Sequence, residues 1–173
     1  MTVDPVIILI ARFGLTWLFL DALAHKLRDV REFGVVLAAY RVLGERWIRV
    51  AVWLVIAIEA AIAAGALLQY APAYALAGIV LLGYAAAMTI NLWRGRRFID
   101  CGCGGATQPL SVGLVVRNLA LASASLVAML PIVGRPLGWL DLVTVVLGTA
   151  VLATLYAAIN QLLAARAQLE EWV

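Results

Sequence analysis

Apolar residues run along this chain of 173 residues in five long blocks, which short polar segments separate. A helix that crosses a lipid bilayer needs about 20 mostly apolar residues. The blocks therefore predict five membrane spans, at residues 6–24, 47–69, 74–93, 111–130 and 140–163. The expected fold is all-α: a polytopic helical bundle of four core transmembrane helices with a fifth at the C-terminal end. Because the pattern shows no internal repeat, we expect one domain over residues 1–173.

The polar segment after the first block has a different pattern. Across residues 25–46, apolar positions recur at steps of three and four among many charged residues. This spacing is typical of an amphipathic helix, and such a helix next to a span is expected to lie in the membrane interface. The helix would serve either as a solvated connection or as a cover over a functional site.

Composition supports a membrane protein. Hydrophobic residues make up 65% of the chain and charged residues 13%, whereas soluble domains are about half apolar and about a quarter charged. The net charge is +3, but most of the positive residues lie in two loops, so we expect no nucleic-acid partner. No Lys or Arg precedes the first apolar block, and this block is expected to be a retained span, not a cleaved signal.

Candidate chemistry centres on Cys101 and Cys103, which a single glycine separates in the loop between the third and fourth spans. A disulfide requires Cα atoms about 4.4–6.8 Å apart, so the chain has to turn between the cysteines, and Gly102 permits that turn. So short a loop gains little stability from a disulfide, and a strained disulfide is readily reduced. The pair, preceded by Asp100, therefore favours redox exchange.

Two other interpretations of the cysteines remain open. Zinc takes four ligands, and the single histidine, His25, lies far along the chain and does not complete the set. We therefore assign no metal ligands, although two thiolates alone can bind a soft ion such as Cu(I). A soft-metal binding or transport protein is thus one alternative. A non-catalytic scaffold subunit with incidental cysteines is the other.

Two charged residues fall near the middle of predicted spans. Arg12 and Glu59 each lie 12 residues from the end of a span on the side of the cysteine loop, which is a depth of about 18 Å. An unpaired charge in a span is costly. Their equal depth and opposite sign predict a buried ion pair, with either a purely structural or a gating role.

A second set of polar residues is expected just beneath the cysteine loop. It consists of Asp21, His25, Asn91, Arg117 and Asn118. A cationic Arg117 beneath a thiol would favour the thiolate, the form that attacks disulfides. His25 would act either as a proton carrier or as a hydrogen-bonding residue at the end of a helix.

These residues together resemble a known family. The most specific part is the sequence Gly-Arg-Arg-Phe-Ile-Asp-Cys-Gly-Cys-Gly at residues 95–104, followed by Arg117 and Asn118. Further positions that carry the likeness are Phe13, residues 21–26, Phe33, Tyr40 and Glu59. The chain resembles the methylamine-utilisation MauE family of DoxX-like membrane proteins from about residue 6 to about residue 130. One departure is that the family often has an aromatic residue where this chain has Gly104 or Gly105.

The resemblance implies an accessory role in forming disulfides in an exported enzyme. In the namesake system that enzyme is methylamine dehydrogenase, and the usual partner is a membrane-tethered thioredoxin-like protein. The layout is also similar to vitamin K epoxide reductase and DsbB-type bundles, in which a cysteine pair passes electrons to a quinone. This chain has two cysteines, so any relay cysteines would belong to a partner.

The resemblance and the charge distribution disagree on orientation. The implied role places a multi-pass protein in the inner (plasma) membrane, with its cysteine loop on the oxidising outer face. However, nine Lys and Arg residues lie in the segments on the cysteine side, and Arg135 alone lies in the segments on the other side. By the positive-inside rule this bias places the cysteines in the cytoplasm. We expect the outer face, because many of the positive residues alternate with acidic ones.

Overall fold

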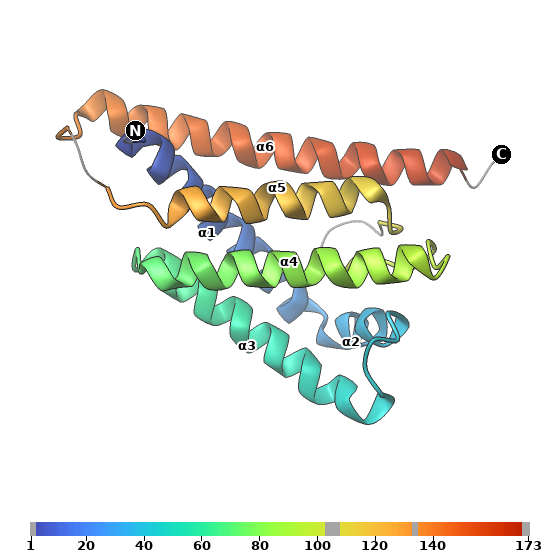
Figure 1. The fold of residues 1–173 in the computed structure, drawn as a ribbon. Coiled ribbons are helices and arrows are strands. Elements are labelled where there is room, and N and C mark those ends of the chain that lie inside the picture. Colours follow the sequence, from blue (N-terminus) through green and yellow to red (C-terminus); the bar gives the residue numbers. More distant parts are fainter. Residues whose placement is uncertain (1–2, 103–107, 133–134, 171–173) are drawn as a thin grey trace.

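The computed structural model describes residues 3–102, 108–132 and 135–170, and Figure 1 shows their arrangement. Across these residues the chain forms six α-helices. They are α1 (Pro5–Arg28), α2 (Val30–Ala39), α3 (Ile48–Leu67), α4 (Ala71–Trp93), α5 (Val112–Ala128) and α6 (Trp139–Glu170), and a 3₁₀ turn (Glu45–Trp47) precedes α3. The predicted all-α fold is confirmed.

Four of these helices, α1, α3, α4 and α6, are long and apolar enough to cross a membrane. The fourth predicted span is observed as α5, which has 17 residues and so falls at the lower end of the range of about 17–25 residues for a spanning helix. The chain is therefore a multi-pass membrane protein.

Two helices differ in length from their predicted segments. α1 continues four residues beyond the expected end at residue 24, so that Asp21, His25 and Lys26 all lie on one helix. The amphipathic segment is helical only from Val30 to Ala39. Asp29, directly before it, is the N-cap: its Oδ1 accepts a hydrogen bond of 2.8 Å from the Glu32 backbone N–H.

The helices pack in a layered bundle. Figure 1 shows α4, α5 and α6 running nearly parallel to one another, while α1 and α3 cross them obliquely. The main buried core lies between α1, α3, α4 and α5, and includes Phe19, Ile62, Tyr74 and Leu81. α6 packs chiefly against α1 and leaves most of its surface exposed, as expected for a lipid-facing helix at the edge of a bundle.

The two ends of the bundle differ in what they carry. One end holds the start of α1, the α3–α4 turn and the segment before α6 (Figure 1). There Arg135 bonds both carboxylate oxygens of Asp141 at 2.6 and 2.7 Å, and this carboxylate raises the pKa of Arg135 above its usual value. The other end holds the end of α1, α2, the start of α3 and the cysteine loop, and it carries the candidate site.

Candidate functional site

The cysteine loop is pinned at its base by backbone hydrogen bonds. Asp100 and Pro109 form an antiparallel bridge, and the Cys101 N–H donates to the Gln108 carbonyl at 2.9 Å. The Leu110 N–H donates to the Arg97 carbonyl at 2.9 Å. These bonds close the base of the loop directly before Gly102, at the cysteine end of the bundle.

Gly102 has the conformation that the sequence predicts for a turn. Its φ is +69°, in the left-handed region that glycine adopts without steric cost. The Asp100 side chain supports the turn, because its Oδ1 accepts a hydrogen bond of 2.9 Å from the Gly102 N–H. Cys103 lies outside the described residues, so the geometry of the predicted pair stays a prediction.

Cys101 lies beneath α2, next to the apolar core of this end. It is 8% exposed and packs with Tyr40, Met88 and Leu114. The Tyr40 hydroxyl donates to the Cys101 carbonyl at 3.0 Å, and the Cys101 Sγ lies 3.7 Å from Gln108 Oε1. The sulfur is therefore close to the aqueous end of the bundle but shielded by one helix.

The ion pair predicted between Arg12 and Glu59 is wrong. Glu59 is fully buried, and its Oε1 accepts hydrogen bonds from Lys26 Nζ at 2.9 Å and from the Tyr84 hydroxyl at 2.6 Å. Lys26 is itself only 4% exposed, and its ammonium also lies 5.2 Å from the centre of the Phe33 ring. Because α1 stays helical as far as Arg28, the Lys26 side chain points into the bundle and its ammonium contacts Glu59.

Arg12 instead forms hydrogen bonds at the opposite end of the bundle, where α5 ends. Its Nε donates to the Ala128 carbonyl at 2.9 Å and its Nη2 to the Leu130 carbonyl at 3.0 Å. Its Nη1 lies 3.3 Å from Gln69 Oε1. Arg12 thus caps the C-terminal end of α5, where helix carbonyls lack intrahelical partners, and this role satisfies the guanidinium without Glu59.

Arg117 lies on α5, and among the described residues its side chain is linked to Cys101 through Asn160 and Gln108. Its Nη1 donates to Asn160 Oδ1 of α6 at 2.5 Å, and its guanidinium lies 5.3 Å from the centre of the Tyr156 ring. The Asn160 carbonyl accepts from Gln108 Nε2 at 2.6 Å, and Gln108 neighbours Cys101. The chain of contacts therefore links α5 and α6 to the base of the loop.

The remaining predicted residues are spread over this end. His25 Nε2 lies 3.6 Å from Asp21 Oδ1, and both side chains are partly exposed. Asn118 donates to the Leu114 carbonyl at 2.9 Å, and Asn91 to the Ala87 carbonyl at 3.0 Å. Asn91 and Asn118 thus donate to carbonyls within their own helices, and the Asn91 carbonyl accepts a hydrogen bond of 2.9 Å from the Arg96 N–H at the start of the loop.

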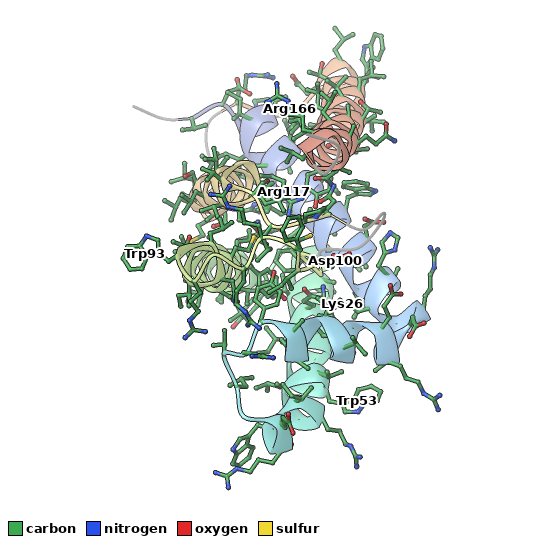
Figure 2. The ribbon with its side chains drawn as sticks, turned by 90° about the vertical axis from the view of Figure 1, so that its right-hand side faces the viewer. Lys26, Trp53, Trp93, Asp100, Arg117 and Arg166 are labelled. Carbon is green, nitrogen blue, oxygen red and sulfur yellow. The ribbon has the colours of Figure 1, made fainter. Side chains whose placement is uncertain are left out.

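Three cavities meet around Lys26. The first, of about 90 Å³, opens among polar groups that include His25, Asp29 and Asp100. The second, of about 70 Å³, is largely apolar and includes Tyr40, Tyr84 and Cys101 in its lining. The third, of about 30 Å³, includes Glu59, Tyr84 and Arg117. Figure 2, a view onto this end of the bundle, shows Lys26 and Asp100 near one another at its centre, whereas Trp93 points outward.

Sequence reasoning placed Lys26 on the solvated part of the interface helix and assigned no role to Tyr84 or Gln108. A signal for Lys26 was present, since Arg12, Phe19 and Lys26 are spaced by seven residues and so share one face of a continuous helix. All three are buried. Tyr84 lies in an apolar span without a comparable signal.

A quinone does not fit the described part of the site. The cavity that Cys101 lines has about 70 Å³, far below the roughly 300–1,000 Å³ of typical small-molecule sites.

The fold and the site define a class: a polytopic α-helical membrane protein that carries a cysteine loop over a buried ion pair at one end of its bundle. The chain belongs to the MauE family, because the family model described as "Methylamine utilisation protein MauE" matches residues 4–131. That match covers α1 to α5 and the cysteine loop, and confirms the resemblance seen in the sequence.

Individual relatives agree with the family match. The methylamine utilization protein MauE of Paracoccus denitrificans is 41% identical over 128 residues, which cover 72% of this chain and 69% of the relative. The protein of the same name from Paracoccus versutus is 37% identical over 165 residues, covering 92% of this chain and 88% of the relative. No solved structure matches the chain.

Proposed function

We propose that this protein is a membrane thiol–disulfide exchange protein that supports the maturation of an exported, disulfide-containing protein. Its relatives bear the name of methylamine utilization, and we take methylamine dehydrogenase as the target. The single observation that carries the proposal is the loop geometry. The hydrogen-bonded base holds Cys101 beneath α2 at the cysteine end of the bundle, and Gly102 has the positive φ that a turn between two cysteines requires.

The exchange has two steps. A thiolate of the target attacks the Cys101–Cys103 disulfide, whose S–S bond breaks as a mixed disulfide forms, and one of the two cysteines leaves as a thiolate. The second target thiolate then displaces the remaining cysteine. The target loses two electrons and gains a disulfide, and the Cys101–Cys103 pair gains two electrons as a dithiol. A thioredoxin-like partner in its disulfide form reoxidises the pair by the same chemistry.

Contacts at the rim support a docking role for this end of the molecule. α2 contacts the loop through Phe33 and Val36, which pack against Gly102. Because the sulfur of Cys101 is largely covered by this helix, a partner reaches it by displacing α2 or by engaging the second cysteine first. We assign the attacked position to Cys103, and the resolving position to Cys101.

Trapping a mixed disulfide tests the proposal. In Cys101→Ser, the resolving thiol is lost, and a complex between Cys103 and its partner should accumulate on a non-reducing gel. The double variant Cys101→Ser/Cys103→Ser is the control and should trap nothing. If Cys101→Ser traps no protein and the target's disulfides form normally, the exchange function is wrong.

A further inference from the structure

A groove between α2 and the start of α3 lies outside the cysteine site. Its volume is about 670 Å³, within the roughly 300–1,000 Å³ of typical small-molecule sites. α2 contributes Val30 and Gly34 to the lining, and α3 contributes Val52 and Trp53. Trp53 is exposed, and Figure 2 shows it projecting from α3 below α2. The walls of the groove are thus apolar, and part of this apolar surface is uncovered.

The groove lies where α3 enters the membrane. The 3₁₀ turn and α3 together form an apolar span from Glu45 to Leu67, so the first turn of this span lies at the level of the lipid headgroups. An exposed tryptophan, Trp47, is typical of that level. From Arg49 to Trp53 the helix rises by about 6 Å toward the hydrocarbon. A ligand in the groove therefore meets headgroups at one end and acyl chains at the other.

Two arginines line the polar end of the groove. They are Arg46 and Arg49, which lie three residues apart, and both are exposed. The ion pairs of the described residues involve neither of them, and the Arg46 guanidinium lies 5.6 Å from the centre of the Trp47 ring. Glu45 also lines the groove, so its charged groups sum to one positive charge. The groove therefore complements a ligand with a single negative charge.

We propose that this groove binds one glycerophospholipid with an anionic headgroup. Arg46 and Arg49 bind the phosphate oxygens, which match the geometry of a guanidinium, and an acyl chain lies against Val52 and Trp53. A zwitterionic headgroup fits less well, because the two arginines repel its cation. A free phosphate ion would leave the apolar walls uncovered. The lipid site goes beyond the proposed exchange function and uses neither cysteine.

Native mass spectrometry of the purified full-length protein in detergent tests the site. Phosphatidylglycerol and phosphatidylcholine with identical acyl chains are added at equal concentrations, and phosphatidylglycerol should bind first. Arg46→Gln and Arg49→Gln should each weaken its binding about fivefold, and the double variant about thirtyfold, as expected for basic residues next to an anionic lipid. Equal binding of the two lipids to the unmodified protein would overturn the proposal.

Matched variants separate the groove from general charge effects. Arg28→Gln/Arg31→Gln removes two exposed arginines from the same end of the bundle that do not line the groove, and should leave the binding unchanged. An equal loss in this control would show that overall charge binds the lipid, and the groove would be wrong. Glu45→Gln should strengthen the binding severalfold, a gain that a misfolded variant would not show. Weaker or unchanged binding in Glu45→Gln would contradict the charge complementarity.

Inorganic phosphate tests whether the ligand is a lipid. A large excess of phosphate, compared with chloride at the same ionic strength, should not displace phosphatidylglycerol, because a free ion makes no contact with the apolar walls. Displacement by phosphate alone would show a site for a small anion and would overturn the lipid site. Because these measurements need no thiol chemistry, their outcome is independent of whether the exchange function holds.

Discussion

Two features of the structure require a glycine at position 102. Its φ is +69°, and a Cβ at this position would lie 3.0 Å from Val36 Cγ1. A residue with a side chain in the left-handed region costs about 1–2 kcal/mol, and the contact with α2 adds to that cost. The glycine therefore permits both the turn and the close approach of α2 to the loop.

Replacing Gly102 should show both effects. Gly102→Ala should lower the free energy of unfolding by about 1–2 kcal/mol from the backbone alone, and by more because of the Val36 contact. Gly95→Ala is the matched control, since Gly95 has a φ of +73° and a Cβ there would meet no other described residue within 4 Å. Chemical unfolding in detergent measures both. Equal losses would contradict a packing role for Gly102.

The choice of partner for Glu59 shows what residue spacing can and cannot predict. Spacing identified Glu59 as a buried carboxylate, but the equal depth that it gave Arg12 and Glu59 is wrong, because Arg12 lies at the level of Gln69 and Glu59 at the level of Lys26. It determined neither the length of α1 nor the direction in which each charged side chain points. Arg12 is occupied by the carbonyls at the end of α5, and the extra helical turn of α1 places Lys26 at Glu59. Only tertiary packing decides between the two cations.

At the scale of elements, α2 is the cover of the site. Its residues Phe33 and Val36 contact Gly102, and Tyr40, directly after the helix, bonds the Cys101 backbone. No residue of α2 itself is fully buried, so the helix is held by limited contact area. A helix of ten residues has little stability of its own. The N-cap therefore contributes a large share of the free energy that keeps α2 folded over Cys101.

Removing the N-cap should uncover Cys101. Asp29→Ala loses the bond to the Glu32 N–H, at a cost of about 1 kcal/mol, and alkylation of Cys101 should become about fivefold faster, the ratio that this energy corresponds to. Asp29→Asn is the control, because asparagine caps helices about as well but lacks the charge. If Asp29→Asn accelerates alkylation as much as Asp29→Ala does, charge and not capping controls access.

The order and type of the elements were predictable because each span needs a long apolar block, and the lipid solvent allows few alternatives to a helix. The ends of the elements were less predictable. Residues 25–28 are His, Lys, Leu and Arg, a sequence that suits either the end of α1 or the start of α2. The break falls at Asp29, where an N-cap side chain is available.

At the scale of the whole molecule, the charge asymmetry between the two ends is the main constraint on orientation. Several positive residues of the cysteine end are engaged within the fold. Lys26 is paired with Glu59, and Arg94 and Arg96 donate to the carbonyls of Arg41 and Ala39. Lys26 therefore adds no net charge to this end, whereas Arg94 and Arg96 keep theirs, and we propose from the oxidising environment that a cysteine pair needs that the cysteine loop faces the outside of the plasma membrane.

Surface labelling tests this orientation. In Cys101→Ser/Cys103→Ser protein, Glu45→Cys places a thiol at the cysteine end and Leu137→Cys places one at the other end, and both positions are exposed. A membrane-impermeant maleimide should label Glu45→Cys on intact cells, and Leu137→Cys only after permeabilisation. The reverse pattern would place the cysteine loop in the cytoplasm and would agree with the positive-inside rule.

The central claim is that Cys101 and Cys103 cycle between a dithiol and a disulfide. A redox titration of the purified protein tests it most directly: the protein is equilibrated with glutathione buffers of graded potential, quenched with a maleimide, and weighed by mass spectrometry. The account predicts a reversible two-electron transition, in which the labelled form gains two maleimides as the buffer becomes reducing. The account is contradicted if both thiols still react with maleimide after equilibration with oxidised glutathione. It is also contradicted if oxidation gives only mixed disulfides with glutathione and no bond between Cys101 and Cys103.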